Sequence, residues 1–123
     1  MNAAEFRCLY EYLGLTREWV AANLTVTLDT ITRWEDGTEP IPASAAVDLG
    51  GLSTMTSKLV HELATRLRWG GTITTYQTDA EFRIADPYGL TYPAPWHRAV
   101  AARVADRAVD VNIQFSGEGH DPD

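Results

Sequence analysis

Four side chains of one short stretch have chemistry that could read the edges of bases in double-stranded DNA. If the stretch is helical, the side chains that face outward together are Leu28, Asp29, Thr32 and Arg33. A guanidinium can donate two hydrogen bonds to guanine, a leucine can contact the thymine methyl group, and a carboxylate can accept from cytosine. Structural roles stay open, because Arg33 could instead pair with Asp29 or Asp36 on a solvated helix face, and Asp29 suits a helix N-terminus.

Donors for the DNA backbone are present around the same stretch. Hydroxyl groups and helix N-termini supply many phosphate contacts in protein–DNA complexes. Thr16, Thr27 and Thr38 are candidate hydroxyl donors, and Arg17 is a candidate cationic donor. The sequence therefore contains both kinds of contact, to bases and to phosphates, that a DNA-binding surface needs.

The charge of the chain argues against a general affinity for polyanions. The formal net charge is −7, with 10 basic against 17 acidic residues. Residues 1–42, which hold the candidate DNA contacts, carry three arginines against seven acidic side chains, a net charge of −4. Because non-specific DNA affinity depends on neutralising phosphates, we expect any DNA binding to be specific, with a low non-specific affinity.

No other chemistry is indicated by the residue types. The three histidines are scattered, the single cysteine excludes an internal disulfide, and no cluster has the spacing of metal ligands. Neither a phosphate-binding glycine loop nor a nucleophile elbow is present. We therefore expect no catalytic residue, no metal and no cofactor, with Cys8 partly buried and His97 a hydrogen-bonded structural residue.

The composition is that of a globular protein, with 45% hydrophobic and 22% charged residues. No apolar run approaches the roughly 20 residues that span a bilayer, and the N-terminus lacks the pattern of a signal peptide. A single cysteine fits a reducing compartment. These observations predict a cytoplasmic protein without a membrane segment.

Three short helices are predicted before Pro42 by the spacing of apolar residues and by capping residues. They span residues 3–13, 17–24 and 28–36. Thr16 and Thr27 are favourable N-caps for the second and third helices. Gly14 and Gly37 can end the first and third helices.

The remainder predicts a long helical segment and then a small α/β region. The expected elements are a helix over 43–69 that breaks or kinks near Gly50-Gly51, a strand over 72–76, a short helix over 78–85, a helix from Trp96 and a strand over 109–115. The last strand alternates apolar and polar residues, and we expect it to pair antiparallel with the first. The tail over 116–123 has nothing to bury and is predicted to be disordered.

Residues 13–42 also contain an ordered set of motif residues. The set comprises LGLT before the second helix, Ala21 within it, Val26 in the turn, Ile31 in the third helix and the closing RWEDG. This segment resembles the helix-turn-helix of lambda-repressor-like, Cro/repressor-type regulators. A small Ala21 allows close helix crossing, and the resemblance implies that the third helix enters the major groove of DNA.

Three features depart from that motif. The turn has Thr25 where glycine is common, so Thr25 must tolerate an unfavourable backbone angle. A first-helix arginine that often pairs with the third-helix glutamate is replaced by Tyr10, so Glu35 is expected to use Tyr10, Arg7 or solvent. The loop after the third helix is TEP rather than basic, which removes a phosphate contact.

A second likeness covers almost the whole chain. It rests on TITTY, TDAEF and WHRAVAARVADR after the helix-turn-helix, chiefly on Tyr76, Phe82, Trp96 and the AVAARVA run over 99–105. The chain resembles small phage and bacterial autoregulators that include anti-CRISPR-associated repressors. The resemblance implies a C-terminal dimerisation domain and a homodimer that binds inverted repeats in promoters.

The expected fold class is α+β, mainly α, in four parts. These are a helix-turn-helix domain over 1–42, a connecting helical segment over 43–69, an α/β dimerisation lobe over 70–115 and a disordered tail over 116–123. One copy has too little core to cover the strand edges and apolar strand face of the lobe. The candidate dimer-interface residues are Leu59, Leu63, Tyr76, Trp96, Val100, Val111 and Ile113.

The main hypothesis is a homodimeric, sequence-specific DNA-binding repressor. The alternative is an acidic protein-interaction module, such as an antitoxin-like or immunity partner, that uses the same scaffold without binding DNA. RNA binding is a third possibility, although no aromatic stacking platform is evident.

Overall fold

The computed structural model describes residues 1–85 and 92–117 of the chain. Within these ranges the fold is α+β and mainly α, as predicted, with six helices and one two-stranded sheet. The elements in chain order are α1 (Ala3–Tyr12), α2 (Arg17–Leu24), α3 (Leu28–Asp36), α4 (Ala43–Arg66), β1 (Gly71–Thr75), α5 (Asp79–Ala85), α6 (Ala94–Arg107) and β2 (Val111–Phe115). The predicted disorder of 116–123 falls mostly on residues outside these ranges.

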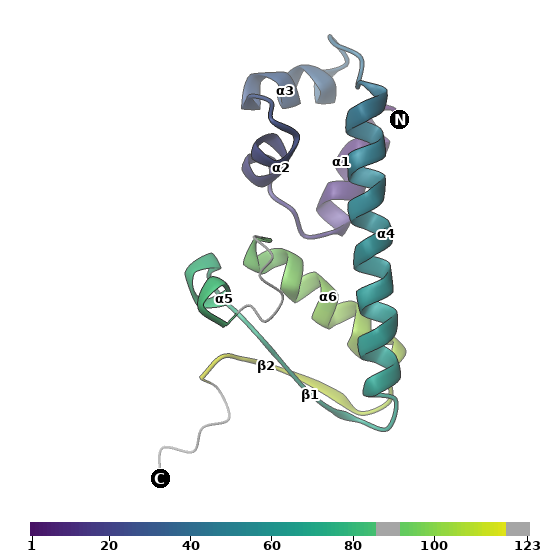
Figure 1. Cartoon of the computed structure of the whole chain (residues 1–123), viewed down its shortest axis with the longest axis vertical. Helices are drawn as coiled ribbons and strands as arrows, with labels where there is room; N and C mark the ends of the chain where they lie inside the picture. The colour runs from purple at the N-terminus through teal and green to yellow at the C-terminus, as the bar shows by residue number, and fades with distance from the viewer. Residues whose placement is uncertain (86–91, 118–123) are drawn as a thin grey trace.

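The long helix α4 joins two groups of elements (Figure 1). α1, α2 and α3 gather around one end of α4, while α5, α6 and the sheet lie toward the other end (Figure 1). α6 packs on α4 and on both strands, and it is the centre of the second group. α3 and the sheet therefore lie at opposite ends of the molecule.

The predicted capping residues set the starts of α2 and α3. The Thr16 hydroxyl accepts the Trp19 N–H at 3.1 Å, and the Thr27 hydroxyl accepts the Thr30 N–H at 3.1 Å. Each cap satisfies a backbone donor that the first helical turn leaves unpaired. Between the two helices Thr25 adopts the left-handed conformation at φ 58°, as its position in the motif predicts. The boundaries predicted for both helices are confirmed.

A continuous hydrophobic core passes from the helix-turn-helix into the C-terminal elements. In the first group Phe6 lies edge-on against Trp34, with ring centroids 5.6 Å apart. In the second group Trp96 stacks on Tyr92 at 4.0 Å and donates its indole N–H to the Thr56 hydroxyl at 3.0 Å. The two groups of elements therefore share one buried interior.

Gly14 is a point of close approach between the two groups. It has φ +72°, and a Cβ atom built on it would lie 2.3 Å from the carbonyl oxygen of Pro95 in the first turn of α6. Only glycine combines this backbone conformation with so small a volume. Gly14 therefore both ends the turn after α1 and lets α6 pack against it.

The structure corrects the predicted break in the long helix. α4 is continuous through Gly50 and Gly51. The flanking residue Leu49 is buried in the core, and Leu52 packs against it. Packing of the neighbouring residues therefore outweighs the roughly 1 kcal/mol by which each glycine disfavours a helix interior.

The structure also corrects the predicted direction of the strands. β1 and β2 are parallel, with Gly71 paired to Val111, Ile73 to Ile113 and Thr75 to Phe115. Parallel strands need a long crossover connection, usually helical. The connection between these strands contains α5 and α6, and α6 covers the sheet.

α6 carries its predicted apolar stripe into the core. Trp96, Val100 and Val104 are each at most 1% exposed. This corrects the prediction that Trp96 and Val100 belong to a dimer interface, because a single chain already buries both side chains. α6 also begins earlier than predicted, at Ala94 after Pro93.

The other candidate interface residues differ in accessibility. Leu59, Leu63 and Tyr76 are partly buried and pack against the core of their own chain. On β2, Val111 is partly buried and Ile113 is exposed.

Across the described ranges, no helix combines the length and the apolar character needed to cross a lipid bilayer.

Candidate nucleic-acid interface

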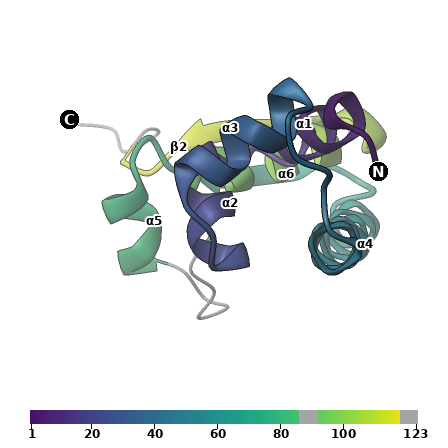
Figure 2. The same cartoon turned by 90° about the horizontal axis from the view of Figure 1, so that it is seen from above.

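α3 presents an exposed face at one end of the molecule. Ile31 and Trp34 on its inner side are buried in the core. The residues left exposed are the four candidate base contacts, Leu28, Asp29, Thr32 and Arg33, together with Asp36 at the end of the helix. Seen from above, α3 crosses the near side of the molecule and is not covered by another element (Figure 2). An exposed helix at the end of the molecule is an arrangement that a major groove can receive.

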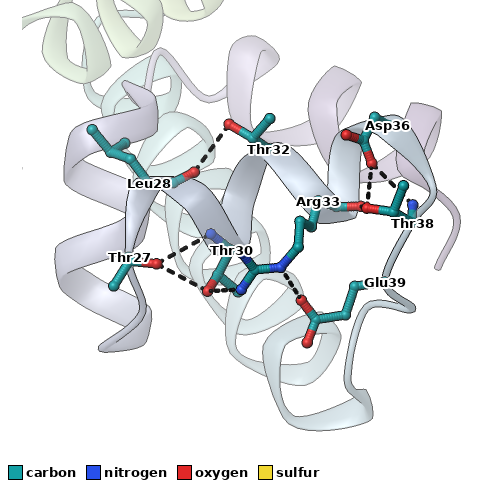
Figure 3. Close-up of polar contacts among 8 residues, drawn as sticks. All are labelled: Thr27, Leu28, Thr30, Thr32, Arg33, Asp36, Thr38 and Glu39. Atoms are coloured by element: carbon teal, nitrogen blue, oxygen red, sulfur yellow. Dashed lines mark hydrogen bonds and ion pairs between the residues drawn. The ribbon is translucent and has the colours of Figure 1, made fainter.

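Arg33 is held within the chain by two other side chains (Figure 3). Its Nε donates to the Glu39 carboxylate at 2.9 Å, and its Nη2 donates to the Thr30 hydroxyl at 3.1 Å. The ion-pair partner of Arg33 is therefore Glu39, in the loop after α3, which corrects the sequence-based alternatives Asp29 and Asp36. The two paired side chains are 49% and 43% exposed, so an external ligand can reach both.

Glu35 is the centre of a second polar network, between α1, α2 and α3. One carboxylate oxygen accepts from the Tyr10 hydroxyl at 3.0 Å, and the other accepts from Arg17 Nε at 2.9 Å. Arg7 Nε lies 3.7 Å from the same carboxylate. The expected partners Tyr10 and Arg7 are confirmed, and Arg17 is an additional one. Arg17 also donates to the Thr32 hydroxyl at 2.6 Å, which ties a candidate phosphate contact to a candidate base contact.

This network predicts a loss of stability at alkaline pH. Burial, followed by the hydrogen bond to Glu35, raises the pKa of Tyr10 from 10.0 to about 12. Because the folded chain holds this proton more tightly than the unfolded chain, the free energy of unfolding should fall as the pH rises from about 10 to 12. Urea unfolding at several pH values should show this decrease, with a smaller slope in Tyr10→Phe.

Burial also raises the pKa of Tyr92, so a residual slope should remain in the Tyr10→Phe variant. Equal slopes in the wild-type protein and the variant would contradict the assignment of the raised pKa to Tyr10.

The three candidate hydroxyl donors also have structural roles. Thr16 and Thr27 accept hydrogen bonds as N-caps, and a capping hydroxyl acts as an acceptor that still carries a proton of its own. Thr38 donates both its hydroxyl, at 2.7 Å, and its backbone N–H, at 2.9 Å, to one oxygen of Asp36. These two hydrogen bonds lower the pKa of the Asp36 carboxyl. The hydroxyl of Thr38 is therefore engaged by the turn that follows α3.

The remaining histidine and cysteine candidates lie away from α3. Nδ1 of His97 is 2.7 Å from the Thr75 hydroxyl in the interior, which confirms the predicted structural role of His97. Cys8 is exposed on α1, which corrects the expectation of partial burial, because α1 turns the Phe6 and Tyr10 side into the core instead. Among residues 1–85 and 92–117, no group of histidine, cysteine, aspartate and glutamate is arranged to hold a metal ion.

A comparison with protein families agrees with this arrangement. A family model described as Aca2/YdiL-like matches residues 1–113, from α1 into β2. The chain belongs to the Aca2/YdiL-like family. This is a family of helix-turn-helix regulators associated with anti-CRISPR genes, and it confirms the resemblance seen in the sequence. A search of curated proteins found no match.

Two contacts of this Aca2/YdiL-like chain are not apparent from its sequence spacing. Arg17 and Glu35 are 18 positions apart, and only the packing of α2 on α3 brings them together. The contact between Arg33 and Glu39 crosses the turn at Gly37. One signal was available, because Glu39 is an acidic residue in a loop that is often basic in related motifs.

Proposed function

We propose that this Aca2/YdiL-like protein is a homodimeric, sequence-specific DNA-binding repressor of its own promoter or a nearby operon. The observation that carries the proposal is the exposed face of α3, which combines a guanidinium, a hydroxyl, a carboxylate and an aliphatic side chain. Membership in a regulator family supports the same class of activity. In this proposal Arg33 binds guanine, Leu28 contacts a thymine methyl group, and Asp29 accepts from cytosine or orients Arg33.

Contacts to the DNA backbone would come from the residues around α3. An open hollow of about 350 Å³ beside the helix is lined by Arg7, Arg17, Thr32, Glu35 and Asp36. The first-turn N–H groups of α2 and α3, together with the hydroxyls of Thr16 and Thr27, add neutral donors. These donors can position α3 on the duplex without a large positive charge.

The net charge of −4 over residues 1–42 gives the proposed complex a distinct salt response. A protein that neutralises few phosphates releases few counterions, so its affinity falls less steeply with salt concentration. Each good base contact contributes roughly 1–3 kcal/mol of discrimination. We therefore expect weak binding to random duplexes and clear preference for an operator.

Self-association through the C-terminal lobe would place two α3 helices on one inverted repeat. Trp69 is 87% exposed and Val109 is 67% exposed. Gly70, which follows Trp69, lies close to the backbone of Val109. The side chains of Trp69 and Val109 are therefore at the same end of the sheet. Exposed apolar groups of this kind are typical of association surfaces. The proposed dimer surface comprises the candidates Val111 and Ile113, with Trp69 and Val109 added.

A protein partner is the second candidate, and the internal ion pairs of the helix-turn-helix favour it. Within residues 1–42 each arginine is paired with a carboxylate of the same chain, namely Arg7 with Glu11, Arg17 with Glu35 and Arg33 with Glu39. The excess of negative charge on this part would complement a basic protein surface. In that case the protein would bind no duplex DNA at any salt concentration.

Selection of duplexes from a random library, at low and at moderate salt, tests the proposal. Enrichment of an inverted repeat is the expected result, and the half-site spacing then reports the separation of the two α3 helices. Failure to enrich any sequence at either salt would overturn the DNA-binding proposal in favour of the protein partner.

The Arg33→Ala variant is expected to lose specific binding to the selected operator. Loss of one base contact in each protomer lowers affinity by about 2–6 kcal/mol in total, or roughly 30-fold to more than 10,000-fold. The melting temperature and the association state should stay unchanged, because Arg33 is exposed. Arg66→Ala, which removes an exposed arginine near the other end of α4, is the matched control. An unchanged operator affinity in Arg33→Ala would show that α3 is not the recognition helix.

A further inference from the structure

We propose that Glu39 competes with DNA for Arg33 and thereby restrains the affinity of the α3 face. This proposal rests on the proposed DNA-binding function and adds an internal restraint to it. The Glu39 carboxylate accepts from Nε of the guanidinium that would bind a base, at 2.9 Å (Figure 3). When Arg33 binds DNA, its hydrogen bond to Glu39 must therefore break, or Glu39 and the DNA must share the guanidinium.

The two contacts of Arg33 fill one side of its guanidinium. Nε donates to Glu39, and Nη2 donates to Thr30 at 3.1 Å. A bidentate contact with guanine needs two neighbouring N–H groups in one plane. A base that uses the Nε–Nη2 edge of Arg33 must displace both partners. Glu39 is the stronger obstacle of the two, because both groups of its hydrogen bond are charged, whereas the Thr30 hydroxyl is neutral.

The pair is built into the turn after α3 rather than formed by two loose side chains. The backbone N–H of Glu39 donates to the carbonyl oxygen of Arg33 at 3.2 Å. Gly37, at φ +82°, reverses the chain at this point, and Pro40 restricts the backbone directly after Glu39. Glu39 is therefore held beside Arg33 whenever this turn is formed.

The restraint is graded, because the pair is close to half exposed. Exposed ion pairs are weak and are screened by salt, so DNA can break this pair at a modest cost. The same carboxylate also adds a negative charge close to the approaching phosphates. Both effects lower operator affinity without preventing binding.

Operator binding by Glu39→Gln, measured by fluorescence anisotropy with the selected duplex, tests the proposal. Glutamine keeps the size of the side chain and removes its charge. We expect affinity to rise about three- to tenfold, since a dimer contains two such pairs. Glu18→Gln removes one exposed acidic charge from the first turn of α2 and serves as the matched control. Its effect at moderate salt should be less than about twofold.

A double-mutant cycle separates pairing from general repulsion. In an Arg33→Ala background, at low salt where weak binding stays measurable, Glu39→Gln should gain clearly less affinity than in the wild-type background, because only the repulsion of phosphates is then relieved. An equal gain with and without Arg33, or no gain in the wild-type background, would overturn the role of Glu39. If neither the wild-type protein nor Glu39→Gln bound any duplex, both this inference and the proposed function would be overturned.

Discussion

The Gly14→Ala variant is expected to lose about 3 kcal/mol or more of its free energy of unfolding. An alanine at φ +72° adopts a left-handed conformation that costs an L-residue about 1–2 kcal/mol. Its Cβ would also lie 2.3 Å from the Pro95 carbonyl oxygen and 2.9 Å from the Trp96 Cα. Both neighbouring atoms belong to the backbone, so no rotamer change relieves the overlap. The turn after α1 and the first turn of α6 must move apart.

Two other glycines supply controls for this experiment, which measures urea unfolding. Gly37→Ala, at φ +82° with open space around its Cβ, carries only the conformational cost of about 1–2 kcal/mol. Gly51→Ala, inside α4 with open space, should raise stability by about 0.5–1 kcal/mol. If Gly14→Ala were as stable as Gly37→Ala, the close approach of α6 to this turn would be wrong.

The Trp96→Ala variant is expected to lose about 3–5 kcal/mol of its free energy of unfolding. Trp96 is 1% exposed, stacks on Tyr92 at 4.0 Å and lies 6.2 Å from the Phe82 ring. Its indole N–H also links α6 to α4 through Thr56. The substitution therefore removes a large buried ring and leaves a cavity among α4, α5 and α6.

Trp69→Ala is the matched control, because it deletes the same side chain from an 87% exposed position. Its stability should change by no more than about 0.5 kcal/mol. Thermal or urea unfolding of both variants should be compared under conditions that give them the same association state. Similar losses in Trp69→Ala and Trp96→Ala would contradict the placement of Trp96 in the core.

The helices of the N-terminal part are predictable because their signals are local. Thr16 and Thr27 cap the helices that follow them, and Gly37 ends α3 in the left-handed conformation. The 3.6-residue period of α3 also places Ile31 and Trp34 inside, which leaves the candidate base-reading face outside. Each inference depends on residues only a few positions apart.

The arrangement of the C-terminal part depends on contacts between distant segments. The direction of β2 follows from the packing of α6 across the sheet, although two helices between two strands are already typical of a parallel pair. The apolar stripe of α6 is visible in the sequence, yet the sequence does not show whether this chain or a second copy covers it. Packing of α6 on α4 settles this for Trp96 and Val100.

The ion pairs of the candidate site were the least predictable part. The pair of Arg17 and Glu35 forms because α2 and α3 pack against each other. The pair of Arg33 and Glu39 forms because the chain reverses at Gly37. Charge spacing along one helix, which suggested Asp29 and Asp36 for Arg33, does not describe contacts made across a turn.

The uninterrupted course of α4 has a consequence for the geometry of an operator. Its 24 residues span about 36 Å at 1.5 Å per residue, from the helix-turn-helix to the sheet. In the proposed homodimer this length works as a fixed spacer between the surface that joins two copies and the surface that meets DNA. One inserted residue would turn the two ends of the spacer by about 100° against each other. The two α3 helices of the dimer would then no longer face the same side of the double helix.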